Sequence, residues 1–87
     1  MNKKWSDIAW SEYLYWQKTD RKMVETINKL IKDIERNGVL KEQGEPEKLK
    51  YQYQKAYSRR INHEHRLVYY VEGTDLMIVS CKGHYED

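Results

Sequence analysis

The chain has 87 residues and a formal net charge of +2, from 16 lysines and arginines against 14 acidic residues. This length predicts a single small domain, residues 1–87, that buries somewhat more than ~60% of the surface exposed by its unfolded chain. The single cysteine, Cys81, excludes an internal disulfide and favours a reducing compartment. No apolar run approaches the ~20 residues that cross a bilayer and no signal-peptide pattern is present, so we expect a soluble, cytoplasmic protein without a membrane partner.

Two helices are predicted in the first half of the chain. Ser6 followed by Asp7 favours a helix start, because a hydroxyl can accept hydrogen bonds from free amides and an acid suits the first turn. The amphipathic pattern continues to about Lys18. A second helix is predicted from Arg21 to Asn37, where apolar residues recur at helical spacing: Met23, Val24, Ile27, Leu30, Ile31 and Ile34. Gly38 then supplies the left-handed residue that commonly ends a helix, so two antiparallel helices with a tight connection are expected.

The second half of the chain has the pattern of strands. A polar stretch, 41–47, contains the only proline and predicts a loop. The predicted strands are Lys3–Trp5, Leu49–Tyr53, Tyr57–Asn62, Arg66–Glu72 and Leu76–Lys82. The third and fourth of these are expected to form a hairpin around His63–His65. Helices first and strands afterwards indicate the α+β class, with two N-terminal antiparallel helices packed on one face of a small antiparallel β-sheet.

The length of the turn at Glu72–Asp75 decides which side chains share a face of the sheet. A two-residue loop would place Arg66 opposite Cys81. An odd number of loop residues would place Arg66 opposite Lys82, with His84 diagonally beside it. Both registers fit the sequence, and we favour the odd one because it gathers these three cations on the open face. The same register predicts that three side chains point toward the helices: Met77, Val79 and Cys81.

Positive charge is concentrated in residues 47–66. Six basic residues in this stretch stand against two acidic ones: Lys48, Lys50, Lys55, Arg59, Arg60 and Arg66 against Glu47 and Glu64. A local basic field of this kind attracts phosphates. Because Arg59 and Arg60 are adjacent on a predicted strand, their side chains point to opposite faces. One is expected to bind phosphate, and the other to pair with an acid on the helices or to contact a partner.

A set of short motifs lies in order along nearly the whole chain. They are Trp5-Ser6, Tyr13-Leu-Tyr-Trp-Gln17, Leu30-Ile-Lys-Asp33, Pro46-Glu47, Ser58-Arg-Arg-Ile61, Glu64-His-Arg-Leu-Val-Tyr69 and His84-Tyr85. Together they resemble the YoeB (Txe) toxins, which belong to the RelE-like group of bacterial toxin–antitoxin systems. The resemblance implies a RelE-like fold and an mRNA endonuclease that works in the A site of the 70S ribosome without a metal or cofactor, and so inhibits translation. It also implies a cognate acidic antitoxin of the YefM or Axe kind, and a possible homodimer.

Residue roles follow from this resemblance by position. Glu47 matches the general base, Arg66 the phosphate-binding arginine and His84 the general acid. Tyr85 matches a C-terminal residue that supports the site and completes the expected catalytic set. Lys50 and Arg60 match basic residues near the scissile phosphate. The full set of expected RNA contacts is Lys50, Arg59, Arg60 and Lys82.

Several polar residues of the sequence also have a simpler interpretation. Glu47 in a polar loop and His84 near the C-terminus could be exposed residues without a chemical role. His63 and His65 fit a solvated or RNA-facing turn better than a zinc site, because no cysteine pair or acidic cluster accompanies them. Cys81 fits a small core residue better than a nucleophile.

Two other functions are compatible with the sequence. A catalytically inactive RNA- or ribosome-binding module would use the same basic strands without cutting RNA. A purely structural partner of another protein would have no salt-dependent affinity for RNA, whereas phosphate contacts weaken as salt rises.

Overall fold

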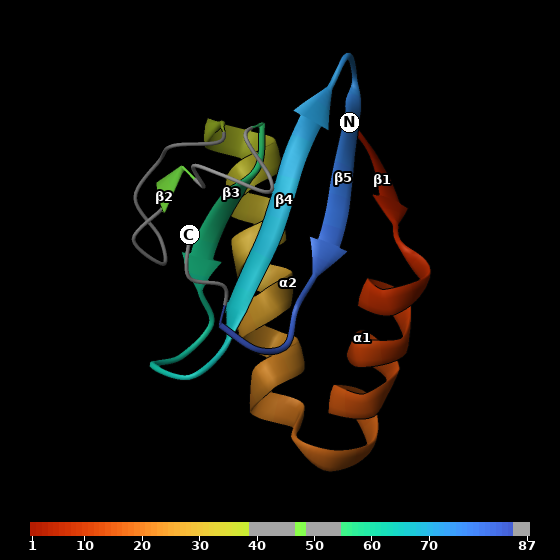
Figure 1. The fold of residues 1–87 in the computed structure, drawn as a ribbon, viewed down its shortest axis with the longest axis vertical. Helices are drawn as coiled ribbons and strands as arrows, with labels where there is room; N and C mark the ends of the chain where they lie inside the picture. The colour runs from red at the N-terminus through yellow and green to blue at the C-terminus, as the bar shows by residue number, and fades with distance from the viewer. Residues whose placement is uncertain (39–46, 49–54, 85–87) are drawn as a thin grey trace.

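The computed structural model describes residues 1–38, 47–48 and 55–84. The elements in chain order are β1 (Asn2–Trp5), α1 (Asp7–Thr19), α2 (Arg21–Asn37), β2 (Glu47–Lys48), β3 (Tyr57–Arg60), β4 (Arg66–Glu72) and β5 (Asp75–Ser80). The α+β class is confirmed, with both helices before the central strands (Figure 1). The strand predicted at 49–53 lies outside the described residues, as does most of the predicted loop 41–47. None of the described helices is long and apolar enough to span a membrane.

The helix ends are set by three residues, of which the sequence indicates Ser6 and Gly38. Ser6 caps α1, its Oγ accepting a hydrogen bond from the Ala9 amide at 2.9 Å. Asp20 follows α1 and caps α2 through a 3.1 Å bond from the Lys22 amide to its carboxylate. Gly38 ends α2 with φ 95°, a conformation that L side chains rarely adopt. The tight connection between the helices therefore rests on one aspartate that ends one helix and begins the next.

The described strands form one sheet in the order β1-β5-β4-β3-β2. The hairpin β3–β4 is confirmed, and β2 and β5 extend it on either side as antiparallel neighbours. The sheet is mixed rather than purely antiparallel, because β1 pairs with β5 in parallel. A parallel neighbour requires a long crossover, which the helices and intervening strands supply. The short edge strand predicted at Lys3–Trp5 is confirmed.

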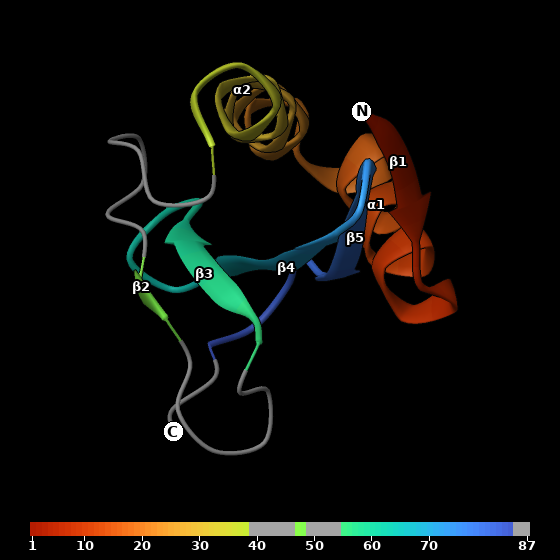
Figure 2. The ribbon, with the colours of Figure 1, turned by 90° about the horizontal axis from the view of Figure 1, so that it is seen from above.

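The helices cover one face of the sheet and the main core lies between the two layers (Figure 2). Its buried residues come from both helices, β4, β5 and the segments that follow β3 and β5: Ala9, Trp16, Met23, Ile27, Leu30, Ile31, Ile34, Ile61, Leu67, Tyr69, Leu76, Ile78 and Cys81. A smaller cluster of Ala56 and Val68, with Val79 against it, forms a separate group. Val68 lies between Leu67 and Tyr69 on β4, so strand alternation assigns this cluster to the opposite face.

The register between β4 and β5 differs from the predicted one. Glu72 pairs with Asp75, so the loop has two residues, and Gly73 adopts the positive φ of 62° that such turns favour. The odd register is therefore wrong at the turn, and Leu76 and Ile78 point into the helix-side core in place of Met77 and Val79.

A β-bulge then changes the pairing further along β5. Tyr69 pairs with Ile78, but Val68 pairs with Ser80, which leaves Val79 as an extra residue. From this point the pairing is that of the odd register. Cys81 accordingly lies in the helix-side core as expected. One inserted residue thus reconciles a two-residue turn with a C-terminal segment offset by one position.

Candidate functional site

Two arginines lie directly opposite each other on the central hairpin. Arg60, on β3, pairs with Arg66, on β4. Both are two residues from the Ser58–Val68 pair, so they share the face turned away from the helices. Like charges opposed on neighbouring strands repel, and this arrangement is favourable when an anion lies across them.

The turn of this hairpin is built around Asn62. Its Oδ1 accepts hydrogen bonds from the amides of Glu64, at 2.8 Å, and His65, at 2.7 Å. Such an Asx turn replaces the backbone bonds that the turn cannot make for itself. The Arg66 Nη1 donates to the carbonyls of Asn62, at 2.7 Å, and His65, at 3.2 Å. The Arg66 guanidinium is therefore oriented by the same turn that orients His65.

The segment after β5 is fastened to α1. The Cys81 amide donates to Glu12 Oε1 at 2.8 Å, and Trp16 Nε1 donates to the Cys81 carbonyl at 2.9 Å. Figure 1 shows this dark blue segment turning at the lower end of the sheet and crossing the start of β4. Both backbone polar groups of Cys81 are thus satisfied by side chains of one helix.

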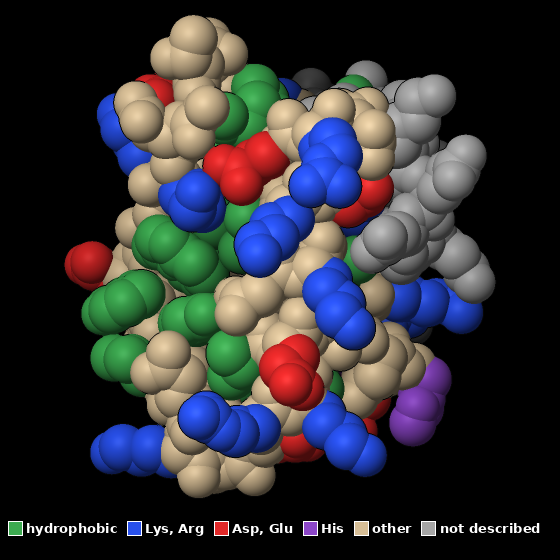
Figure 3. All heavy atoms as spheres, turned by 180° about the vertical axis from the view of Figure 1, so that it is seen from behind, with side chains coloured by type: hydrophobic (Ala, Val, Ile, Leu, Met, Phe, Trp, Pro, Cys, Tyr) green, Lys and Arg blue, Asp and Glu red, His purple; other side chains and the backbone are tan. Residues whose placement is uncertain are grey.

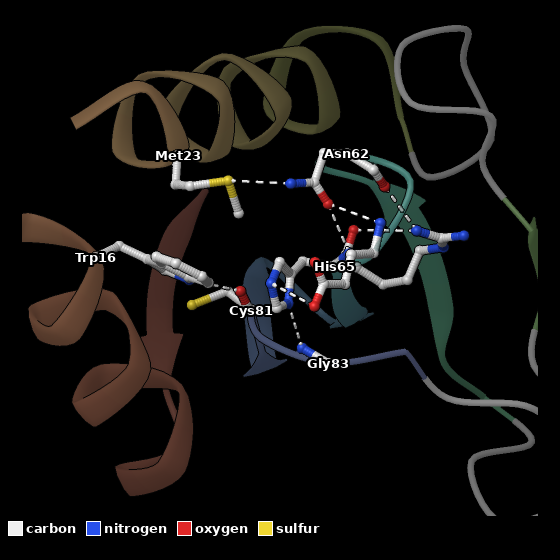
Figure 4. Close-up of polar contacts among 8 residues, drawn as sticks. Trp16, Met23, Asn62, His65, Cys81 and Gly83 are labelled. Carbon is white, nitrogen blue, oxygen red and sulfur yellow. Dashed lines mark hydrogen bonds and ion pairs between the residues drawn. The ribbon is translucent and has the colours of Figure 1, made fainter. Parts of the chain in front are cut away.

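The same segment is fastened to the hairpin two residues later. The Gly83 amide donates to His65 Nδ1 at 2.9 Å (Figure 4). The Gly83 carbonyl accepts from the Arg66 amide at 2.9 Å. The next residue, His84, is exposed. Described contacts therefore bring the backbone that carries His84 next to Arg66.

The other predicted site residues are described to different extents. Glu47 lies in β2, where its backbone pairs with Ser58. Lys82 is exposed, with its Nζ 5.3 Å from the centre of the Tyr15 ring. Two predicted residues lie outside the described part of the chain: Lys50 and Tyr85.

Arg59 is not placed to contact RNA. Its side chain is fully buried and forms an ion pair with Asp33 of α2. Its Nη2 donates to the Gly38 carbonyl at 2.8 Å and its Nε to the Tyr69 hydroxyl at 2.9 Å. The prediction of an RNA contact at Arg59 is therefore wrong for this structure. The alternative, that one arginine of the pair binds an acid on the helices, is what the structure has, and it leaves the exposed Arg60 as the candidate for phosphate.

The helix layer carries both basic and acidic side chains. Seen from behind, its Lys and Arg side chains are interspersed with Asp and Glu, while hydrophobic side chains gather along one side (Figure 3). Lys3 of β1 pairs with Glu35 of α2 at 3.0 Å. The exposed large hydrophobic residues of α1 are Ile8, Trp10, Leu14 and Tyr15.

The expectation of a solvated or RNA-facing turn is wrong for His65, whose side chain is 15% exposed. Together with Glu12 and Trp16 it supports the C-terminal segment, a role that we did not predict for any of the three. Their partners lie 18 to 69 residues away in the sequence. No local pattern marks such distant contacts. Among the described residues, no group of three His, Cys, Asp or Glu side chains could hold a metal ion.

Burial changes the acidity of two groups beneath the site. Desolvation by burial raises the pKa of Glu12. The hydrogen bond from the Cys81 amide and the charge of Lys82 act in the opposite direction and lower it. Burial, with a smaller effect of the Glu12 charge, raises the pKa of the Cys81 thiol from 9.0 to about 12. Because the thiolate is the nucleophilic form, Cys81 is inert at neutral pH, as a core residue should be.

The raised pKa of Cys81 predicts a loss of stability in alkali. Between pH 9 and 12 the unfolded chain releases the thiol proton while the folded chain keeps it, so the free energy of unfolding falls as pH rises. The slope approaches ~1.4 kcal/mol per pH unit. In urea titrations we expect wild type to lose about 1–1.5 kcal/mol more than Cys81→Ala between pH 8 and 10. Equal losses in the two proteins would show that this thiol titrates normally.

Comparison with known proteins identifies the class first. The structure of the YoeB dimer from Staphylococcus aureus matches with a TM-score of 0.93 and 53% identity, covering 98% of both chains. A heterotetrameric YoeB–YefM toxin–antitoxin complex from the same organism matches with a TM-score of 0.91, 53% identity and the same coverage. The fold is that of the RelE-like bacterial toxins.

The sequence comparisons then identify the family. Residues 5–85 match the profile of the YoeB-like toxins of bacterial type II toxin–antitoxin systems. Toxin YoeB of Escherichia coli K12 is 48% identical over 81 residues, which cover 93% of this chain and 95% of the relative. The chain belongs to the YoeB toxin family.

Proposed function

We propose that this toxin is a ribosome-dependent, metal-independent mRNA endonuclease that cuts in the A site of the 70S ribosome. The observation that carries the proposal is the opposition of Arg60 and Arg66 beside the backbone that leads to His84. Two guanidinium groups on one face suit a phosphodiester, because each offers a planar fork of donors to phosphate oxygens.

The proposed chemistry uses the 2′-hydroxyl next to the scissile phosphate as nucleophile. Glu47 takes the hydroxyl proton, and the 2′-oxygen attacks phosphorus. Arg66 stabilises the charge that develops on the phosphoryl oxygens, and His84 gives a proton to the departing 5′-oxygen. The products are a cyclic phosphate and a free 5′-hydroxyl, and DNA is excluded because it lacks the 2′-hydroxyl. The pairing of the Glu47 backbone with Ser58, two residues before Arg60, supports the role of Glu47.

The partners that we propose are mRNA, the ribosome, a cognate acidic antitoxin of the YefM or Axe kind, and a second copy of the toxin. One S. aureus relative is a YoeB dimer, and another is a YoeB–YefM complex. An antitoxin covering Arg60 and Arg66 would supply the anionic groups that this face favours. Such a partner commonly orders on binding.

Induction of the toxin in growing cells tests the proposal. We expect wild type to arrest growth and Glu47→Gln and His84→Gln to relieve the arrest, since a general acid or base contributes ~10²–10⁴ in rate. Cleavage of mRNA on purified ribosomes should fall by the same factor. His63→Gln is the matched control, because His63 is an exposed histidine of the hairpin turn with no part in the proposed chemistry, and it should remain toxic.

The alternative function has a different result. A catalytically inactive RNA- or ribosome-binding module would leave mRNA uncut in every variant while wild type still bound RNA in a salt-dependent manner. A wild type that neither arrests growth nor cuts ribosome-bound mRNA, although folded, would disprove the nuclease.

A further inference from the structure

His65 connects the hairpin to the C-terminal segment through a side-chain atom that accepts a hydrogen bond. Its Nδ1 is 2.9 Å from the Gly83 amide nitrogen (Figure 4). Its ring meets the Trp16 ring edge to face, with centroids 4.9 Å apart and an interplanar angle of 71°. Its backbone is engaged as well, since the Asn62 side chain accepts from its amide and the Ile61 amide donates to its carbonyl. The position and the rotation of this imidazole are therefore both determined.

The accepting nitrogen defines the form of the imidazole. Only an unprotonated ring nitrogen can accept from an amide, so the hydrogen of neutral His65 is on Nε2. That atom is 3.9 Å from Glu64 Oε2. His65 consequently presents a fixed lone pair to the segment after β5. It therefore differs from His84, whose proposed role as general acid requires a proton that can be given away.

Gly83 is held on both sides by the hairpin. Its amide donates to His65, and its carbonyl accepts from the amide of Arg66. It has φ 93°, so it makes a bend that L residues rarely adopt, immediately before His84. The hydrogen bonds from α1 are made to Cys81, two residues before Gly83. The direction in which the chain enters His84 thus depends on the His65–Gly83–Arg66 contacts.

We infer that His65 is a positioning residue for the reaction. Its Nδ1 holds the Gly83 amide and so sets the backbone that carries the general acid His84 beside Arg66. The inference rests on the proposed function, since it assigns His65 a part in the same site. A misplacement of about 1 Å at a reacting group can cost ~10²-fold in rate, so one hydrogen bond at this place has a kinetic effect larger than its effect on stability.

Two substitutions separate the lone pair from the ring. His65→Phe keeps an aromatic ring against Trp16 and removes the acceptor. His65→Asn removes the ring and retains an acceptor, because Asn Oδ1 lies near the position of His Nδ1. We expect His65→Phe to speed hydrogen exchange of the Gly83 amide ~3- to 10-fold. We also expect this substitution to lower kcat ~10- to 100-fold at nearly unchanged KM. The His65→Asn protein should stay within about 3-fold of wild type in both the exchange rate and kcat.

The exchange measurement by NMR on the isolated toxin does not depend on activity. Unchanged Gly83 exchange in His65→Phe would overturn the contact. Faster exchange with unchanged kcat would overturn the positioning role. A His65→Asn protein as impaired as the His65→Phe protein would show that the ring matters and the acceptor does not. If the His65→Phe protein fails to fold, His65→Leu removes the acceptor with an apolar side chain. A wild type without nuclease activity would refute the proposed function and the positioning role together, while the exchange data would still decide the contact.

Discussion

Arg66→Ala is expected to slow RNA cleavage about 10²- to 10³-fold on the proposed mechanism, the usual effect of removing one electrostatic donor from a developing oxyanion. Arg66 lies on the open face of β4, and its Nη1 donates to two backbone carbonyls of the hairpin turn. Loss of these bonds should cost about 1–2 kcal/mol of stability. We therefore expect a folded and nearly inactive protein, measured by cleavage of ribosome-bound mRNA and by urea unfolding.

Arg60→Ala is the matched control for this prediction, because Arg60 is paired with Arg66 across the hairpin. Its loss should weaken RNA binding and reduce the slope of log K against log salt by about 1. Arg66→Lys should recover only part of the activity, since an ammonium retains the charge but lacks the planar fork. An unfolded Arg66→Ala protein would contradict the open-face placement, and a fully active one would contradict the catalytic role.

The helices were the most predictable part of the fold because their signals are local. Ser6 and Gly38 each act within one helical turn of the end that they define. The apolar spacing of α2 identified its buried face, and Met23, Ile27, Leu30, Ile31 and Ile34 are all buried. The hairpin was predictable for the same reason, since its two strands adjoin one turn.

The sheet register was not predictable from the sequence. The two-residue turn sets one register, and the extra residue at Val79 then shifts the pairing of the rest of β5 by one position. The alternation of apolar and polar residues alone cannot reveal such a bulge. The parallel edge formed by β1 depends on where the far end of the chain lies. Neither feature has a local signal.

The site was predictable in part. Alternation established that Arg59 and Arg60 point to opposite faces but could not say which faces the helices. Arg59 faces the helices because it pairs with Asp33, which lies 26 residues earlier in the chain. The resemblance supplied roles for Arg66 and His84, whereas His65 could be recognised only once the structure placed it beside Gly83. Residues that orient a site through long-range hydrogen bonds leave no periodic pattern in the sequence.

Arg59→Met should destabilise the protein by about 3–5 kcal/mol, the cost of removing one partner from a buried ion pair. The Arg59 side chain is fully buried and that of Asp33 is 9% exposed. Removing the guanidinium takes away the hydrogen bonds that Arg59 donates to the Asp33 carboxylate, the Gly38 carbonyl and the Tyr69 hydroxyl. Methionine fills part of the volume, so the loss reflects the broken ion pair more than a cavity. Urea unfolding at neutral pH measures it.

Arg60→Met controls for the loss of an arginine from the same strand and should change stability by no more than ~0.5 kcal/mol, because Arg60 is exposed. The double substitution Arg59→Met with Asp33→Leu removes both charges. It should recover at least half of the loss caused by Arg59→Met, since well-packed apolar residues often replace a buried pair without cost. A double variant as unstable as the sum of the two single variants would mean that the hydrogen bonds to Gly38 and Tyr69, rather than the charge pair, hold β3 against α2.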